Sequence, residues 1–179
     1  MTTRLPVFMF AIVSVITPGP NNVVVLNSVL HNGVRQTLPV YLGICVGFPV
    51  LFVVAGLGLG EVFSHYPVLH WVLKVISVGY LLFLAHKIAF QSDSAKISSS
   101  VIPSSFVGGM LFQWINPKAW VIAIGGISTY TSTGVGLTEI ACVFLFATLT
   151  CMGFWLLLGR SAKSAINTCT RMALMNKVM

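Results

Sequence analysis

Long apolar stretches alternate with short polar ones along the whole chain. Five apolar segments can be separated, at about residues 5–30, 38–60, 67–90, 105–127 and 137–158. A helix needs about 20 apolar residues to cross the hydrocarbon core of a bilayer, so each segment predicts a transmembrane helix. The first segment is too long for the apolar core of a signal peptide and lacks a small-residue cleavage site, so we expect it to be retained.

The polar segment QSDSAKISSS, residues 91–100, divides the chain after the third predicted helix. Three is an odd number of crossings, so a second three-helix unit would enter the membrane upside down, as in transporters built from inverted repeats. We therefore expect an all-α integral membrane protein with a single membrane domain, residues 1–179. Repeat one would cover about 5–90, a linker 91–104, and an incomplete repeat two 105–179.

The first and fourth predicted helices are each interrupted near the middle, by ITPGPNN (16–22) and by FQWINPKAW (112–120). Proline has no N–H and frees the carbonyl four residues before it, which is costly in hydrocarbon unless another group reaches that carbonyl. Proline is also favoured in the first turn of a helix, so Gly19-Pro20 and Asn116-Pro117 each predict the start of a new half-helix. Paired interruptions in two halves indicate a binding site at the membrane midplane.

The polar groups at these interruptions suit an amino acid. N–H groups at a helix start attract an anion such as a carboxylate, and amide side chains both donate and accept hydrogen bonds. Lys118 lies near mid-membrane, where a charge is expensive and usually functional. Since a cation is unfavourable at a helix start, we expect it to have a partner: a substrate carboxylate, a freed carbonyl or an acidic side chain. Helical spacing groups these residues into two faces, one with Thr17 and Asn21, the other with Gln113, Asn116 and Trp120.

Each of these features also has a purely structural interpretation. Prolines kink many membrane helices that bind no ligand, and Lys118 can extend toward the interface or form a structural pair. The amides of Asn21, Asn22, Gln113 and Asn116 can join helices by hydrogen bonds. In the second predicted helix, two glycine pairs with G-x-x-x-G spacing, at 43–47 and 56–60, predict close packing against a neighbouring helix. That helix can belong to the same chain or to another chain of a homo-oligomer.

The composition agrees with a membrane protein and gives an orientation. The chain is 56% hydrophobic and 7% charged, with a mean hydropathy of +0.95, whereas a soluble domain has roughly a quarter charged residues. The net charge of +7 does not indicate nucleic-acid binding, because the basic residues are spread between apolar segments. Seven of them follow the first, third and fifth segments, whereas Arg4 is the one in the opposite loops. The positive-inside rule therefore predicts an N-terminus outside the cell.

The remaining reactive side chains indicate neither a cofactor nor an enzyme. Cys142 and Cys151 are about 13 Å apart along a helix, too far for a disulfide within it, and we interpret all four cysteines as packing residues. No metal-ligand spacing and no nucleophile–base set is present in the sequence. We interpret Glu139 as an interfacial residue.

Four motifs in order and at suitable spacing resemble the LysE/RhtB family of amino-acid exporters. These are TPGPNN (17–22), GxxxGF (43–48), GYLLFLAHK (79–87) and NPKAW (116–120). TPGPNN followed by GVRQT looks most similar to the cysteine/O-acetylserine exporter branch. The resemblance implies a small carrier of the bacterial inner membrane that expels amino acids or close derivatives, driven by the proton gradient.

Carried over residue by residue, the resemblance places Thr17, Pro18, Gly19, Pro20 and Asn21 in the site, with Asn116, Pro117 and Lys118. Together with the polar side chains above, the candidate substrate-binding residues are Thr17, Pro18, Gly19, Pro20, Asn21, Asn22, Gln113, Asn116, Pro117 and Lys118.

The resemblance also implies six helices, whereas five apolar segments are visible here. The closing residues TRMALMNKVM look like the basic lead-in to a sixth helix. Three explanations stay open: a truncated product, a partner chain that supplies the missing surface, or a transporter that works with five helices. A non-transporting remnant or assembly partner and a channel are the rival functions, and a channel would show neither saturation nor a response to a proton gradient.

Overall fold

The computed structural model describes residues 4–59, 65, 68, 75, 103–131 and 134–178. This part of the chain contains helices and no strand, which confirms the predicted all-α fold. The α-helices are α1 (Arg4–Ile16), α2 (Pro20–Asn32), α3 (Val34–Val54), α6 (Phe106–Ile115), α7 (Pro117–Thr131) and α8 (Leu137–Val178), and a short π-helix η1 (Ala55–Leu59) continues α3. The predicted third helix and the polar segment 91–100 lie outside the described residues, apart from Val68 and Val75, so the inverted repeat stays a prediction.

Two helices are long and apolar enough to cross a membrane alone, over Val34–Gly58 and Leu137–Ile166. The pair α1 and α2 would form a third span, bent by 51° at the break between them. The other predicted span is also divided, into α6 and α7. Each apolar segment that the structure describes therefore coincides with one helix or with one broken pair.

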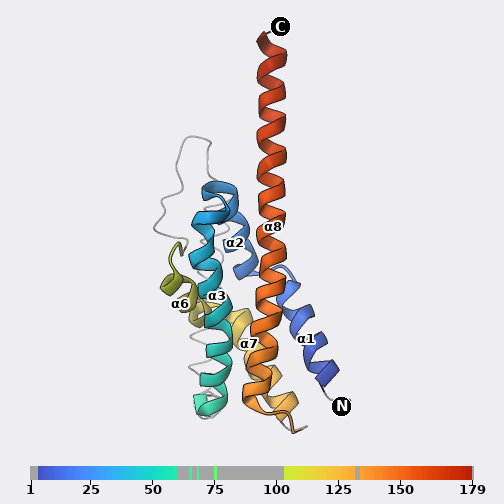
Figure 1. The fold of residues 1–179 in the computed structure, drawn as a ribbon. Coiled ribbons are helices and arrows are strands. Elements are labelled where there is room, and N and C mark those ends of the chain that lie inside the picture. Colours follow the sequence, from blue (N-terminus) through green and yellow to red (C-terminus); the bar gives the residue numbers. More distant parts are fainter. Residues whose placement is uncertain are drawn as a thin grey trace.

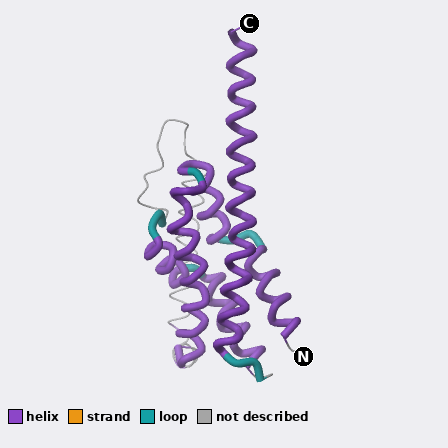
Figure 2. Tube along the Cα trace, in the orientation of Figure 1, coloured by secondary structure: helices purple, strands orange, loops and turns teal. Residues whose placement is uncertain are grey.

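The long helix α8 is the support against which the other helices pack. It contacts α1, α2, α3 and α7, and its C-terminal part extends well beyond their ends (Figure 1). The fifth apolar segment ends at about residue 158, but α8 continues beyond it without interruption (Figure 2). The segment 159–178 contains no proline, so nothing local ends the helix there.

Helices α3 and α6 pack with their backbones in contact. A Cβ atom added to Gly43 would lie 2.0 Å from the carbonyl oxygen of Phe106, and one added to Gly47 would lie 2.7 Å from Cα of Met110. From the other side, a Cβ on Gly109 would lie 2.5 Å from the carbonyl oxygen of Val40. The close packing predicted from the first glycine pair is confirmed.

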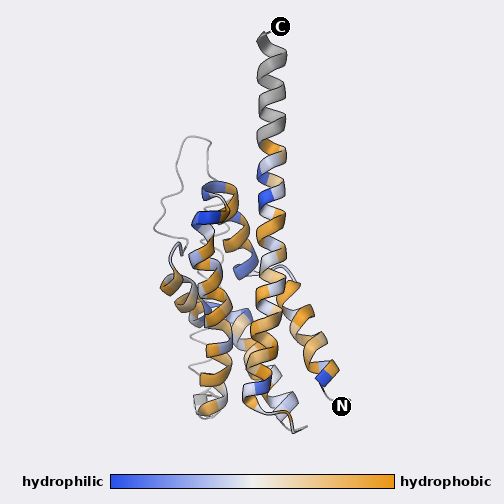
Figure 3. Ribbon diagram, viewed as in Figure 1, coloured by the Kyte–Doolittle hydropathy of each residue, from blue (hydrophilic) through white to orange (hydrophobic). Residues whose placement is uncertain are grey.

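Polar residues collect at the two ends of the helices, and the part between them is mostly apolar except at the start of α2 (Figure 3). At one end, Lys163 Nζ donates to the carbonyl of His31 at 3.2 Å, which joins α8 to the corner between α2 and α3. At the opposite end, Arg4 and Glu139 form an ion pair of 2.7 Å between α1 and α8. Glu139 therefore lies at a polar end, as its interfacial interpretation predicts.

Candidate functional site

Both interruptions predicted from proline are real breaks between helices. Helix α1 ends at Ile16 and α2 begins at Pro20. Helix α6 ends one residue before Asn116, and α7 begins one residue after it. The predicted half-helix starts are thus confirmed. Asn116 has an extended backbone, and its Oδ1 accepts a hydrogen bond of 3.1 Å from the N–H of Lys118. Its side chain therefore caps the first turn of α7.

The carbonyls at the first break are reached by donors from other elements. The carbonyl of Ile16 accepts from the indole N–H of Trp155 at 3.2 Å and from Nδ2 of Asn22 at 3.5 Å. Asn22 Nδ2 also reaches the carbonyl of Val15 at 3.3 Å. Trp155 belongs to α8 and Asn22 to α2. The break therefore forms a cluster of carbonyl oxygens that point at neighbouring side chains, as expected where irregular backbone is tolerated at membrane depth.

Three amide side chains join the two breaks across the molecule. Asn21 Nδ2 donates to Gln113 Oε1 at 2.9 Å, while Asn21 Oδ1 accepts from Gln113 Nε2 at 3.2 Å and from Asn116 Nδ2 at 3.1 Å. Gln113 and Asn116 are only 0% and 3% exposed. The helix-joining interpretation of these amides is therefore correct, and it places polar groups of both breaks at one point.

Lys118 crosses from α7 to the first break. Its Nζ donates a hydrogen bond to the carbonyl oxygen of Thr17. The observed partner is thus a backbone carbonyl at the break, but not one of the carbonyls four residues before a proline. Its stem lies against Gly19, where an added Cβ would be 2.9 Å from Cδ of Lys118. Among the described residues Glu139 is the only acidic one, and it pairs with Arg4. No carboxylate in that part of the chain therefore neutralises Lys118.

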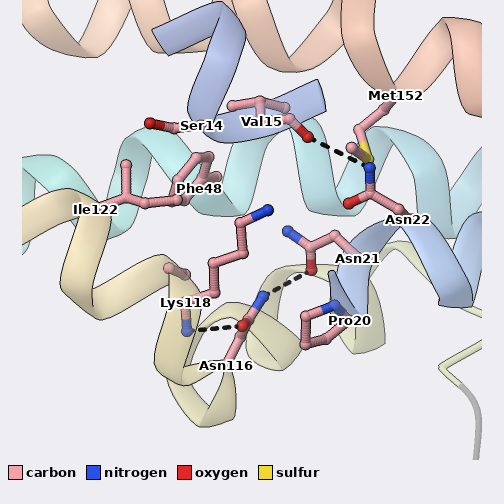
Figure 4. A pocket seen from close by; sticks show the side chains of 11 residues that line it. Ser14, Val15, Pro20, Asn21, Asn22, Phe48, Asn116, Lys118, Ile122 and Met152 are labelled. Carbon is pink, nitrogen blue, oxygen red and sulfur yellow. Dashed lines mark hydrogen bonds between the residues drawn. The ribbon is translucent and has the colours of Figure 1, made fainter. Parts of the chain in front are cut away.

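A small cavity lies where the two breaks meet. Its lining residues are Ser14, Val15, Pro20, Asn21, Asn22, Phe48, Asn116, Lys118, Ala119, Ile122 and Met152. In Figure 4 the side chains of Asn21, Asn116 and Lys118 converge on it from two different elements. Its volume of about 20 Å³ is enough for about one water molecule. In this conformation the protein's own polar groups fill most of the site.

The structure brings most of the predicted site residues together. Of these, Pro20, Asn21, Asn22, Asn116 and Lys118 line the cavity, and Gln113 supports them from behind through Asn21. Gly19 contacts the stem of Lys118, while Pro18 is exposed and Pro117 half-buried at the two helix starts.

Two sequence predictions about shared helix faces are wrong. The break separates Thr17 from Asn21, so they do not lie on one helix; the hydroxyl of Thr17 turns back to the carbonyl of Val13, and only its carbonyl takes part in the site. Trp120 does not line the cavity with Asn116. Its indole N–H donates to the carbonyl of Trp114 at 2.8 Å, on the far side of the second break.

Several residues of the site were not predicted from the sequence. Among them, Ser14, Phe48 and Met152 line the cavity, and Trp155 holds the carbonyl of Ile16. They lie in apolar segments whose periodicity gives no signal for a site. Ser14 belongs to α1, and the packing of α3 and α8 brings the other three to the first break.

Comparison with known proteins gives one matching family and a set of curated relatives. A family model described as "LysE type translocator" matches residues 12–178. A cysteine/O-acetylserine efflux protein of Klebsiella pneumoniae is 33% identical over 124 residues, which are 68% of this chain and 61% of the relative. The same-named protein of Salmonella choleraesuis is 30% identical over 122 residues, 68% and 62% of the two chains.

The matched region covers only part of these relatives. The chain spans about 61% of the length of the Klebsiella protein, and the cysteine/O-acetylserine efflux protein of an Escherichia coli strain, 28% identical over 122 residues, is covered to 62%. No solved structure matches the chain.

Proposed function

Because this chain belongs to the family of LysE type translocators, we propose that it is a secondary transporter that exports amino acids or close derivatives from the cytoplasm. A translocator moves its substrate without changing it, so the protein is not an enzyme. The proposed location is the inner membrane of a bacterium, with several crossings and the N-terminus outside. The basic residues at the α2–α3 corner and on α8, which share one end of the molecule, support this orientation.

The names of the relatives indicate which substrates to test first. They are called cysteine/O-acetylserine efflux proteins, so we propose small polar amino acids of this kind. The site offers groups for both ends of a zwitterion. The carbonyl oxygens of the first break can accept from an ammonium group, and the amides of Asn21 and Asn116 can donate to a carboxylate.

Export would proceed by alternating access about this site, with a proton as the coupling ion. The small cavity would widen toward the cytoplasm to admit substrate and toward the outside to release it. Polar contacts at both ends would have to separate in turn: Lys163 with His31 at one end, and Arg4 with Glu139 at the other. Such contacts are individually weak at exposed positions, which suits parts that open repeatedly.

The amide cluster that joins the two breaks is the observation that carries this proposal. Asn116→Ala removes the Nδ2 donor to Asn21 and the cap of α7 together. We expect it to reduce export at least about tenfold while the protein still inserts into the membrane, because a misplaced site group commonly costs that much. Asn32→Ala makes the same chemical change at an exposed position near the end of α2, and should export normally.

The experiment measures every amino acid in the medium of bacteria that express the chain and are fed dipeptides. Insertion of each variant is checked beside an empty vector. The proposal would be supported if the concentration of one or a few amino acids in the medium rises with the wild-type chain and with Asn32→Ala but not with Asn116→Ala. Those amino acids would then be the substrates. Normal export by Asn116→Ala would remove the site assignment. No export by an inserted wild-type chain would favour the non-transporting alternative.

A further inference from the structure

We propose that Lys118 carries the proton that the transporter exchanges for its substrate, by competing with the substrate's ammonium group for the carbonyl of Thr17. This inference rests on the proposed export function and deepens it. It assigns the coupling of proton and substrate movement to Lys118, which lies beside the second break and reaches the first break with its side chain.

The carbonyl cluster at the first break is a cation site, and a tethered cation already occupies it. The carbonyls of Val15 and Ile16 receive neutral N–H donors from Asn22 and Trp155. The carbonyl of Thr17 instead receives the ammonium of Lys118. An amino acid carries the same ammonium group at its α-carbon, so substrate and Lys118 present identical chemistry to the same oxygen.

The space in the site forces the two cations to compete. The stem of Lys118 lies directly over Gly19, within 2.9 Å of where a Cβ would stand. The remaining cavity of about 20 Å³ holds about one water molecule. Because the Lys118 ammonium already occupies the Thr17 carbonyl, a substrate ammonium that uses this oxygen would compete with it.

The displaced Lys118 has no other charged partner among the described residues. The groups that face it are Ser14 and Thr17 at the first break, Asn21 and Asn22 of α2, Phe48 of α3, Asn116, and Met152 of α8. None of them carries a charge or titrates in the range of cellular pH, and among the residues that the structure describes Lys118 is the one ionisable side chain lining this cavity. An ammonium group without partners at this depth is strongly disfavoured. Its neutral amine therefore accompanies the bound substrate.

The resulting cycle exchanges one proton for one zwitterion. Substrate enters from the cytoplasm, its ammonium takes the Thr17 carbonyl, and the Lys118 ammonium gives its proton to cytoplasmic water. The complex, with a neutral Lys118, opens outward and releases the zwitterion. Lys118 then takes a proton from outside water, returns to the Thr17 carbonyl, and crosses back charged. One proton and one positive charge enter for each amino acid exported, so a proton gradient drives export.

Binding of reduced L-cysteine to the full-length chain, purified in detergent, tests this exchange. In weakly buffered solution with a pH-sensitive dye, the wild-type protein should release about one proton per bound cysteine. Because binding releases a proton, the apparent Kd for cysteine should fall by up to about tenfold for each unit by which the pH rises from about 6 to about 7.5. This range lies below the usual pKa of the cysteine thiol, so the thiol stays protonated.

Variants of Lys118 separate this role from that of a fixed clamp for the substrate carboxylate. Lys118→Met should still bind cysteine, release no proton, and lose the pH dependence of Kd. Lys118→Arg keeps a permanent charge, so it should bind more than about tenfold more weakly. Arg160→Met is the control, because it removes an exposed cation on α8 that does not line the cavity. It should behave like the wild type.

A carboxylate clamp predicts the reverse order. The inference would be overturned if Lys118→Arg still binds cysteine, Lys118→Met does not, and the wild type releases no proton on binding. That outcome would leave the proposed export function intact. Failure of the wild-type chain to bind or export any amino acid would instead overturn the proposed function, and the two failures are therefore distinguishable.

Discussion

Asn21 is the residue at which the two breaks are joined. Its single side chain accepts from both Gln113 and Asn116 and donates to Gln113. A buried amide left without partners costs about 1–3 kcal/mol. The hydrogen bonds of Asn21 therefore fix the position of α2 relative to Gln113 and Asn116, which are 92 and 95 residues away in the sequence. The same junction forms one wall of the cavity, so this side chain would combine a structural role with the proposed binding role.

At Gly19 the structure predicts a loss of transport without loss of the fold. Its extended backbone, with φ of −168°, accepts any residue, but a Cβ there would lie 2.9 Å from Cδ of Lys118. Gly19→Ala should therefore push Lys118 away from Thr17 and lower the export rate about tenfold or more, since small displacements in a site have large effects.

Because the neighbour that must move is a flexible side chain, we expect the free energy of unfolding to change by less than about 1 kcal/mol. Export assays and thermal unfolding in detergent measure the two effects. Gly125→Ala is the control, because a Cβ there meets no atom within 4 Å. Equal export by both variants would contradict the assigned position of Lys118.

The sequence identified those site residues that are unusual where they stand. Asn116 and Lys118 were predictable because an amide and a cation are conspicuous inside an apolar segment. Phe48, Met152 and Trp155 were not, because an apolar residue facing a site has the same sequence pattern as one facing lipid. The turning of Thr17 toward Val13 also required the geometry of the break.

At the scale of elements, the breaks were predictable and the relations between helices were only partly so. Proline chemistry gave the starts of α2 and α7, and glycine spacing gave the close face of α3. The 51° bend between α1 and α2 had no local signal, because tertiary contacts set the direction in which a broken helix resumes. The continuation of α8 to Val178 was also not predicted, since polarity alone does not end a helix.

The contact of α3 with α6 should be the part of the fold most sensitive to a methyl group. A Cβ on Gly43 would lie 2.0 Å from a backbone carbonyl oxygen of Phe106, and neither backbone can move aside without separating the helices. We expect Gly43→Ala to lower the free energy of unfolding by about 1–3 kcal/mol, as overpacking does. Thermal unfolding in detergent measures this, and unchanged stability relative to Gly125→Ala would contradict the close contact.

At the scale of the whole molecule, the two polar ends predict an orientation that can be measured. Gly136 precedes α8 at the end that holds the Arg4–Glu139 pair. Gln36 lies in the first turn of α3 at the opposite end, and both residues are exposed. In a chain whose four cysteines are replaced, Gly136→Cys should react with a membrane-impermeant maleimide in intact cells, and Gln36→Cys only after the cells are opened. The reverse pattern would place the N-terminus in the cytoplasm.

The backbone contact between α3 and α6 also limits how such a molecule can move. Helix α3 belongs to the predicted first repeat and α6 to the second, yet glycines on both let their backbones touch. Two helices in such contact move as one rigid body. In the proposed export cycle, the boundary between moving parts would therefore not coincide with the boundary between the predicted repeats. We expect α3 and α6 to stay together, and the second break at Asn116 to be a place where α7 moves relative to them.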